Sequence, residues 1–217
     1  MDAMAITLRV LPMDDAPRSS DDPLAPLVAR VRAGELPAFE LLYARTREQV
    51  QRTLYRLVGS NSDMEDLIQQ VYLQLLSAIR SFRGDSRFST FLHRVCANVA
   101  LMHLRTRRRH PEELTAELPE EQAGSGSDPE RGAQIQQARA LVERALDQMA
   151  PKKRVVFVYH ELMGLMPEEI ALAVDTSPNT VRSRLHHARL EFTELVSRMT
   201  GERIPEPRRK AGGDDGA

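Results

Sequence analysis

The stretch "MPEEIALAVDTSPNTVRSRLHHARLEFTELV", residues 166–196, carries the most specific local pattern of the chain. It predicts a short helix that begins at Pro167, a tight turn at Asp175, and a longer helix capped by Ser177. Pro178 suits the first position of that second helix, because its missing N–H would have no partner there. This layout is typical of a helix-turn-helix, whose second helix enters the major groove of DNA. The apolar face of the two helices carries Ile170, Ala171, Val174, Val181, Leu185, Ala188, Phe192, Leu195 and Val196.

The opposite face of the second helix is polar and basic, with no acid between Thr176 and Leu190. Helix N-terminal amides and arginine side chains suit phosphates and base edges, so this face indicates DNA binding. An ordinary helical hairpin with a solvated basic face has the same pattern, and the local sequence leaves both interpretations open. Asp175 weakens the motif, because glycine adopts a left-handed turn conformation more easily. The polar face carries Asn179, Arg182, Ser183, His186, His187 and Arg189.

Upstream, residues 23–109 also follow a helical period, which predicts three long helices and an all-α fold without strands. The second helix covers residues 62–80, where Ser62 is a good N-cap and Glu65 completes a capping box. The third covers residues 88–109. The positions expected to be buried are Phe39, Leu42, Tyr43, Val50, Leu54 and Leu57 in the first helix, Met64, Leu67, Ile68, Val71, Tyr72, Leu75, Leu76 and Ile79 in the second, and Phe91, Leu92, Val95, Val99 and Met102 in the third.

The composition changes sharply after the third helix. Residues 110–130 hold seven acids and no Lys or Arg, and their Pro, Gly and Ser residues interrupt helices. This composition favours a flexible acidic linker over a packed element. The expected division is a disordered tail at 1–22, a helical domain at 23–109, the linker at 110–135, a second helical domain at 136–199 and a disordered tail at 200–217.

The overall composition excludes several classes of protein. Trp is absent and aromatic residues make up 5 %, which argues against large aromatic-lined pockets. Cys96 is the only cysteine, so an intrachain disulfide is excluded. No apolar run reaches the roughly 20 residues that span a bilayer or forms a secretory signal. We expect a soluble, cytoplasmic protein that does not insert into membranes and needs no cofactor or metal.

Two long stretches, taken together, resemble one known family. Residues 62–109, "SDMEDLIQQVYLQLLSAIRSFRGDSRFSTFLHRVCANVALMHLRTRRR", resemble region 2 of the extracytoplasmic-function (ECF, group IV) sigma factors of the bacterial sigma-70 family. Residues 141–192, "LVERALDQMAPKKRVVFVYHELMGLMPEEIALAVDTSPNTVRSRLHHARLEF", resemble region 4 of the same family. The resemblance implies a non-enzymatic factor that binds core RNA polymerase and directs it to promoters. It also implies an anti-sigma factor as a further partner.

For region 2, the resemblance implies two sets of functional residues. The clamp helices of the largest polymerase subunit would dock on Asp66, Gln69 and Gln70, although the family usually has an acid where Gln70 stands. Phe91 stands where most members have Trp, and we expect it to pack in the core. The minus-ten element would be opened and read by Phe82, Arg83, Asp85, Ser86, Phe88, Arg94, Asn98, Arg105 and Arg108.

For region 4, the resemblance implies docking on the polymerase flap and recognition of the minus-thirty-five element. His187 stands where an arginine is common, and it would hold a phosphate only when protonated. The residues implied to read this element are Asn179, Thr180, Arg182, Ser183, His186, His187 and Arg189.

The charge distribution fits this division of work. Residues 23–109 hold 14 Arg, no Lys and seven acids, which gives a net charge of +7. Such a domain favours DNA through electrostatic attraction. The resemblance implies that the acidic linker threads the RNA-exit channel of the polymerase, where its carboxylates would mimic a nucleic acid. A solvated spacer remains the alternative.

Two other functions are weighed against the sigma-factor interpretation. A different helix-turn-helix regulator would bind DNA without polymerase, and residues 23–109 would then bind an effector or form a dimer. A metal-dependent enzyme would use His93, Cys96 and His103, since Cys96 and His103 lie two helical turns apart. No carboxylate pair supports that enzyme. Cys96 is instead expected to behave as a small buried apolar residue.

Overall fold

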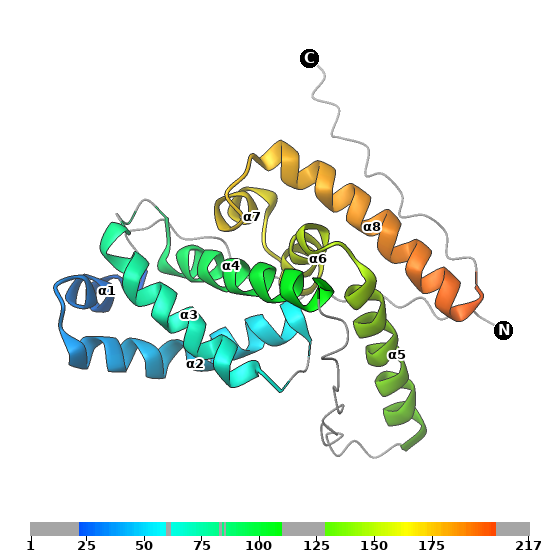
Figure 1. Cartoon of the computed structure of the whole chain (residues 1–217), viewed down its shortest axis with the longest axis horizontal. Coiled ribbons are helices and arrows are strands. Elements are labelled where there is room, and N and C mark those ends of the chain that lie inside the picture. The colour runs from blue at the N-terminus through cyan, green and yellow to red at the C-terminus, as the bar shows by residue number, and fades with distance from the viewer. Residues whose placement is uncertain (1–21, 60–61, 83, 85, 110–128, 203–217) are drawn as a thin grey trace.

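The computed structural model describes residues 22–59, 62–82, 84, 86–109 and 129–202, with the side chains of residues 129–130 excepted. Every regular element in these ranges is helical, in agreement with the expected all-α class (Figure 1). The N-terminal unit, residues 22–109, contains α1 (Ala25–Arg32), α2 (Leu36–Val58), α3 (Met64–Ala78), the 3₁₀ turn η2 (Ile79–Ser81) and α4 (Phe88–Arg109). The C-terminal unit, residues 129–202, contains α5 (Pro129–Gln148), α6 (Pro151–Phe157), the π turn η4 (Val158–Leu162), α7 (Pro167–Ala173) and α8 (Pro178–Thr200).

The core of the N-terminal unit lies between α2, α3 and α4, each of which contacts the other two. Apolar residues that recur every three to four positions lie on one face of each helix, and these faces form the core. Cys96 is fully buried in this core, as expected. The prediction of burial is wrong for Leu76 and Met102, whose side chains are 48 % and 49 % exposed. Each lies at the edge of the apolar face of its helix, and the neighbouring helices cover only the middle of that face.

The start of α3 differs from the expected capping box. The helix begins at Met64, so Asp63 and not Ser62 occupies the N-cap position. The Ser62 hydroxyl instead donates to Asp63 Oδ1 at 3.1 Å. Both residue types are good caps, and the sequence does not distinguish neighbouring candidates.

The first residue of α4 is hydrogen-bonded to Asp22, which lies outside the expected folded domain. Asp22 was assigned to the N-terminal tail, but its carboxylate accepts from the backbone N–H of Phe88 at 2.6 Å and of Leu24 at 2.9 Å. An acid at a helix N-terminus satisfies an otherwise unpaired N–H and complements the helix dipole. Asp22 therefore fixes where α4 begins.

The helix-turn-helix is confirmed in its local detail. Ser177 caps α8 by accepting from the backbone N–H of Thr180 at 3.2 Å, and Pro178 is the first residue of the helix. Asp175 has a positive φ of 50°, so it does adopt the left-handed conformation that the turn needs. Pro167 begins α7, where the Glu169 carboxylate accepts from the Met166 N–H at 2.9 Å.

Helix α5 begins at Pro129, so residues 129–135, which the sequence assigns to the linker, are helical. Residues 110–128, with most of the linker acids, lie outside the described residues. No helix in the described part of the chain is long and apolar enough to cross a membrane.

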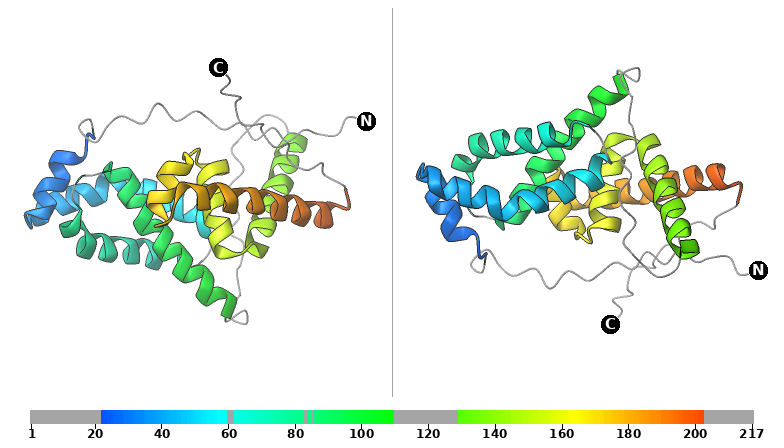
Figure 2. Two further views of the ribbon diagram at one scale, coloured as in Figure 1. Left: turned by 90° about the horizontal axis from the view of Figure 1, so that it is seen from above. Right: turned by 90° about the horizontal axis from the view of Figure 1, so that it is seen from below.

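The two helical units are packed against each other. Helix α4 contacts α3 on one side and both α6 and α7 on another, so it belongs to two interfaces at once (Figure 1). Figure 2 shows the same arrangement from above and from below, with α8 extending away from the N-terminal unit.

Candidate functional site

The exposed face of α8 carries the polar residues expected to contact DNA. Asn179, Arg182, Ser183, His186 and His187 are exposed, whereas Thr180 and Arg189 are half-buried. This arrangement follows from the buried row on the other face, Val181, Leu185, Ala188, Leu195 and Val196, which packs on the rest of the C-terminal unit. The helix can therefore present its first two turns to a groove without unfolding.

Several of these polar groups already have partners within the chain. The Arg182 guanidinium forms an ion pair with Glu168 of α7 and donates to Asn179 Oδ1 at 3.0 Å. Arg189 donates to Glu161 Oε1 at 2.7 Å. The Thr180 hydroxyl is 2.9 Å from Ser177 Oγ, so it supports the helix cap. Binding a phosphate or base through Arg182 therefore requires exchange of an exposed ion pair, which costs little free energy.

The candidate minus-ten residues lie in different environments. Arg94, Asn98 and Arg105 are exposed along one side of α4. Arg108 is exposed at the end of α4, but its Nη2 donates to the backbone oxygens of Gln148 at 3.0 Å and Met149 at 2.6 Å. Sequence reasoning missed this contact, because it joins positions 40 and 41 residues apart.

Phe82, which precedes α4, forms one aromatic cluster with Phe88 and Phe91 of the first turn of α4. The rings of Phe82 and Phe91 are half-buried, with centroids 4.8 Å apart. Phe88 is only 1 % exposed, so its side chain belongs to the core and does not face a base in this structure. Ser86 is half-buried beside this cluster. Arg83 and Asp85 lie outside the described residues.

The exposed face of α3 combines polar and apolar residues. Asp66, Gln69 and Gln70 are exposed, as expected for a docking face. One and two turns further on, Leu73 and Leu76 are 61 % and 48 % exposed. Sequence reasoning missed Leu73, although apolar residues at 71, 72, 73, 75 and 76 are too many for one buried face.

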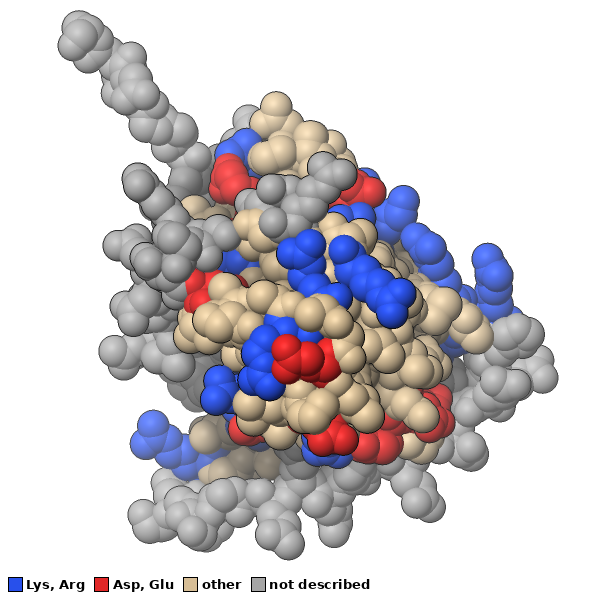
Figure 3. Space-filling model, turned by 90° about the vertical axis from the view of Figure 1, so that its left-hand side faces the viewer, with Lys and Arg blue, Asp and Glu red and all other residues tan. Residues whose placement is uncertain are grey.

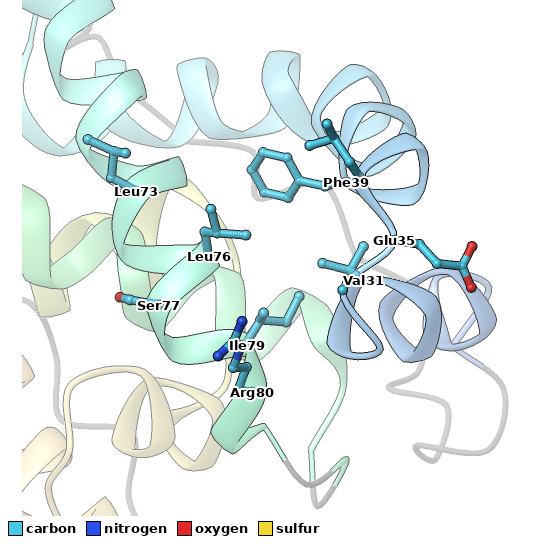
Figure 4. Close-up of a pocket in the computed structure, with 10 residues that line it drawn as sticks. Val31, Glu35, Phe39, Leu73, Leu76, Ser77, Ile79 and Arg80 are labelled. Atoms are coloured by element: carbon cyan, nitrogen blue, oxygen red, sulfur yellow. The ribbon is translucent and has the colours of Figure 1, made fainter.

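These leucines border a groove between α3 and the α1–α2 corner. It has a volume of about 560 Å³. Its walls include Val31, Phe39, Leu73, Leu76 and Ile79, with Arg80 at one end (Figure 4). The face of the molecule that Figure 3 shows is uncharged over much of its area, with a mixed group of basic and acidic residues left of its centre, basic groups toward its upper right and acids along its lower edge. Such a surface suits a protein partner better than a polyanion.

The buried titratable groups do not form a reactive centre. Burial lowers the pKa of His93 to about 4 and raises the pKa of Cys96 to about 12. Burial also lowers the pKa of His103. Both histidines and the thiol are therefore neutral near pH 7. No group of three His, Cys, Asp or Glu side chains within the described ranges is placed to hold a metal ion.

Comparison with known proteins identifies both helical units. The family model for sigma-70 region 2 matches residues 42–110, and that for sigma-70 region 4 matches residues 139–192. The ECF RNA polymerase sigma-E factor of Escherichia coli K12 is 35 % identical over 170 residues, which are 75 % of this chain and 88 % of that protein. The RNA polymerase sigma-H factor of Pseudomonas aeruginosa is 32 % identical over 183 residues, which are 81 % and 95 % of the two chains. The solved structure of CnrH in complex with the cytosolic domain of CnrY has a similar fold, with a TM-score of 0.55 and 21 % identity over 80 % of this chain and 96 % of that one.

Proposed function

The chain belongs to the ECF sigma factors of the sigma-70 family and directs promoter-specific transcription initiation by RNA polymerase, and we propose that three exposed helix faces divide this work. Core RNA polymerase and promoter DNA are accordingly its partners. A helix-turn-helix regulator that acts without polymerase is not favoured, because region 2 accompanies region 4. We further propose that the chain has no catalytic activity of its own and acts in the cytoplasm, where bacterial polymerase works.

The face of α3 is proposed to dock on the clamp helices of the largest polymerase subunit. This proposal rests mainly on Leu73 and Leu76, which remain exposed beside the polar residues Asp66, Gln69 and Gln70. An apolar patch bordered by polar groups is typical of a protein interface, where a few central residues supply most of the affinity. The polar residues would then select the orientation of the partner. Docking on the polymerase flap is proposed for the C-terminal unit.

The face of α8 is proposed to read the minus-thirty-five element. Asn179 and Arg182 lie in the first turns of the helix, where side chains reach base edges in the major groove. Ser183, His186 and His187 continue this face, and Arg189 and Thr180 border it. Arg182 is paired with Glu168 in this structure, and DNA would replace Glu168 as its partner.

The exposed side of α4 and the preceding loop are proposed to act on the minus-ten element. Arg94 would hold phosphates, and Asn98, one turn further along, would contact a base. The half-buried rings of Phe82 and Phe91 offer an aromatic surface on which an unstacked base can rest. Arg83, Asp85, Ser86, Arg105 and Arg108 remain candidates for the same element, whereas Phe88 supports the cluster from the core.

An anti-sigma factor is proposed as a further partner. CnrH, which is similar in fold, was solved with the cytosolic domain of CnrY. The groove between α3 and α1–α2 has mainly apolar walls, which suit the apolar side chains of a partner helix. An anti-sigma factor that occupied it would compete with polymerase for Leu73 and Leu76.

In vitro run-off transcription tests the proposed function. Bacterial core polymerase, the purified chain and a pool of promoters should give transcripts from a defined subset of promoters. The double variant Asn179→Ala and Arg182→Ala provides the control, because it leaves the docking face of α3 intact while removing two base-reading side chains. Specific DNA binding by the free chain, without any polymerase-dependent transcript, would support the regulator instead.

A further inference from the structure

The groove between α3 and the α1–α2 corner leaves large apolar side chains in water. Leu36, Leu73 and Leu76 are 66 %, 61 % and 48 % exposed. Val31 and Phe39 extend the same apolar walls, and Figure 4 shows Leu76 and Phe39 directed into the groove from opposite sides. Apolar surface gains free energy when it leaves water, so this groove favours an apolar occupant.

Arg80 adds a positive charge at one end of the groove. Its side chain is exposed and forms no ion pair with any residue that the structure describes. Glu35, the acid that also lines the groove, is already paired with Arg30 at 2.8 Å. The groove therefore suits a segment in which apolar side chains are followed by an acid.

The N-terminal segment at residues 4–13 (MAITLRVLPM) has this composition. It precedes the described part of the chain, in a tail that is otherwise polar, and two acids follow it directly. Ile6, Leu8 and Val10 occupy alternate positions, so an extended chain carries them on one face. Tails that remain in water contain few large apolar residues, so this run is expected to bind a surface.

The tail joins the folded unit on the basic side of the groove. The described chain begins at Asp22, whose carboxylate accepts from the Phe88 N–H at 2.6 Å. The ring of Phe88 lies 6.2 Å from the ring of Phe82, which directly follows η2. Arg80 is in η2, so the acids that follow the apolar segment are the part of it nearest to this arginine along the chain.

The lengths of the segment and of the groove agree. The groove runs along α3 and η2 from Leu73 to Arg80, or about 11 Å at 1.5 Å per residue. In an extended chain, Ile6 and Val10 are ~13 Å apart. Residues 14–21 can bridge up to about 28 Å, so the segment can reach the far end of the groove without any change in the helices.

We propose that residues 4–13 bind in extended form in the groove of the same chain, with their alternating apolar side chains over Leu73 and Leu76 and the following acids beside Arg80. A segment on a short tether has an effective concentration in the millimolar range, so modest contacts suffice. The contact itself needs no partner. Its consequence rests on the proposed function, because a tail that covers Leu73 and Leu76 competes with core polymerase for the face of α3.

Paramagnetic broadening in the full chain tests where the tail lies. A nitroxide on Ala3→Cys should broaden the amide signals of residues 31–39 and 73–80, most strongly near Leu73, and leave those of α8 sharp. Cys96 is fully buried, so it should not react with the label. A mixture of isotope-labelled chains without nitroxide and nitroxide-labelled chains without isotope should show no broadening. Equal broadening in that mixture would assign the groove to a second copy and overturn the proposal.

Paired variants of the tail test which of its faces binds. Ile6→Ser with Val10→Ser removes the alternating apolar face, and the ratio of bound to free tail should fall by roughly tenfold or more. Leu11→Ser with Met13→Ser removes as many apolar side chains from the other face, and the broadening should stay as in the wild-type tail. Equal broadening for the two pairs would overturn the proposed mode of binding.

Paired variants of α2 test the groove in the same way. Leu36→Ser, in the groove wall, should reduce the broadening, whereas Leu41→Ser, at an exposed leucine outside the groove, should not. Circular dichroism checks that each variant is folded. If the nitroxide on the wild-type tail broadens no groove signals, the tail site is overturned and the groove is open to a partner helix.

Titration with core polymerase separates the tail site from the docking proposal. If the tail competes, Ile6→Ser with Val10→Ser should bind core polymerase several-fold more tightly than the wild-type chain, because more of the chain is competent to bind. Leu11→Ser with Met13→Ser should bind as the wild type does. Broadening that differs between these pairs, together with no binding of polymerase by any of them, would overturn the docking proposal and leave the tail site standing. Equal, measurable affinities would overturn the competition alone.

Discussion

Helices α3 and α8 are both amphipathic, but their exposed faces differ in chemistry. The face of α3 places Leu73 and Leu76 in water beside polar residues, whereas the face of α8 is polar and basic over its first turns. Burial of apolar area stabilises contact with a protein, and cations stabilise contact with phosphates. The chemistry of the exposed face of each helix therefore indicates whether a protein or DNA is the better partner. The buried faces of α3 and α8 give no such indication, because both follow the same helical period.

The largest expected effect concerns the apolar half of this comparison. Leu73→Glu combined with Leu76→Glu should weaken binding to core polymerase by about 100-fold or more, because a few central residues carry most of the affinity of an interface and the variant places two charges among them. The fold should survive, since both side chains are already exposed. Leu41→Glu, at another exposed leucine on α2, is the matched control. Fluorescence titration with core polymerase measures the affinities, and equal values for both variants would remove α3 from the docking surface.

A second prediction contrasts buried and exposed histidines. Burial lowers the pKa of His93 to about 4, so between pH 4 and its ordinary value near 6.5 the unfolded chain binds a proton that the folded chain does not. Stability should therefore fall as the pH falls, by about 2 kcal/mol between pH 7 and pH 5. Urea unfolding at the two pH values measures this difference.

Control variants assign the pH effect to one side chain. His93→Gln should reduce the dependence on pH, whereas His186→Gln with His187→Gln should leave it as in wild type, because those two rings are exposed. An unchanged slope in His93→Gln would show that another group is responsible.

The polar half of the comparison is tested at Arg182. Arg182→Ala should reduce transcription from promoters that depend on the minus-thirty-five element by roughly tenfold, within the range for loss of one base contact. Glu168→Gln removes the acid that pairs with Arg182, so it should act in the opposite direction by a smaller factor. Transcription from wild-type and base-substituted promoters measures both effects. If base changes in that element affect wild type and Arg182→Ala alike, Arg182 does not read it.

The smallest effect is expected at the charged border of the α3 face. Asp66→Arg should weaken core binding by a few-fold, because exposed charges contribute mainly to orientation and association rate. The loss should shrink in higher salt, where such charges are screened. Glu40→Arg, an exposed acid on α2, gives the comparison. A core affinity for Asp66→Arg that matches Glu40→Arg at every salt concentration would place Asp66 outside the interface.

Local chemistry made much of the fold predictable. The Ser177 cap and the left-handed turn at Asp175 both depend on residues within a few positions of one another. The helical period also placed most of the core. It did not predict that Leu76 and Met102 would be exposed. The spacing shows which face of a helix is apolar, but not how much of that face the neighbouring helices cover.

The contacts that the sequence did not predict are all distant along the chain. Asp22 and Phe88 are 66 residues apart, and Leu57 and Arg154 are 97 residues apart. No local pattern marks such pairs, since each partner is a common residue type with other local uses. For the candidate site, the sequence predicted that α8 and α4 would present polar faces. It did not predict that Phe88 would be buried or that Arg108 would donate to the backbone oxygens of Gln148 and Met149, because both depend on how the helices pack.

The hydrogen bond from the Tyr159 hydroxyl to the backbone oxygen of His93, which joins the two helical units, sets an order of events during protein synthesis. The N-terminal unit is complete at Arg109, whereas Tyr159 follows 50 residues later, which takes roughly 3 to 10 s at 5–20 residues per second. During that interval, the α4 surface that later meets α6 and α7 has no partner from the same chain. If the N-terminal unit folds as it is made, a nascent chain offers the face of α3 to polymerase before its C-terminal unit exists.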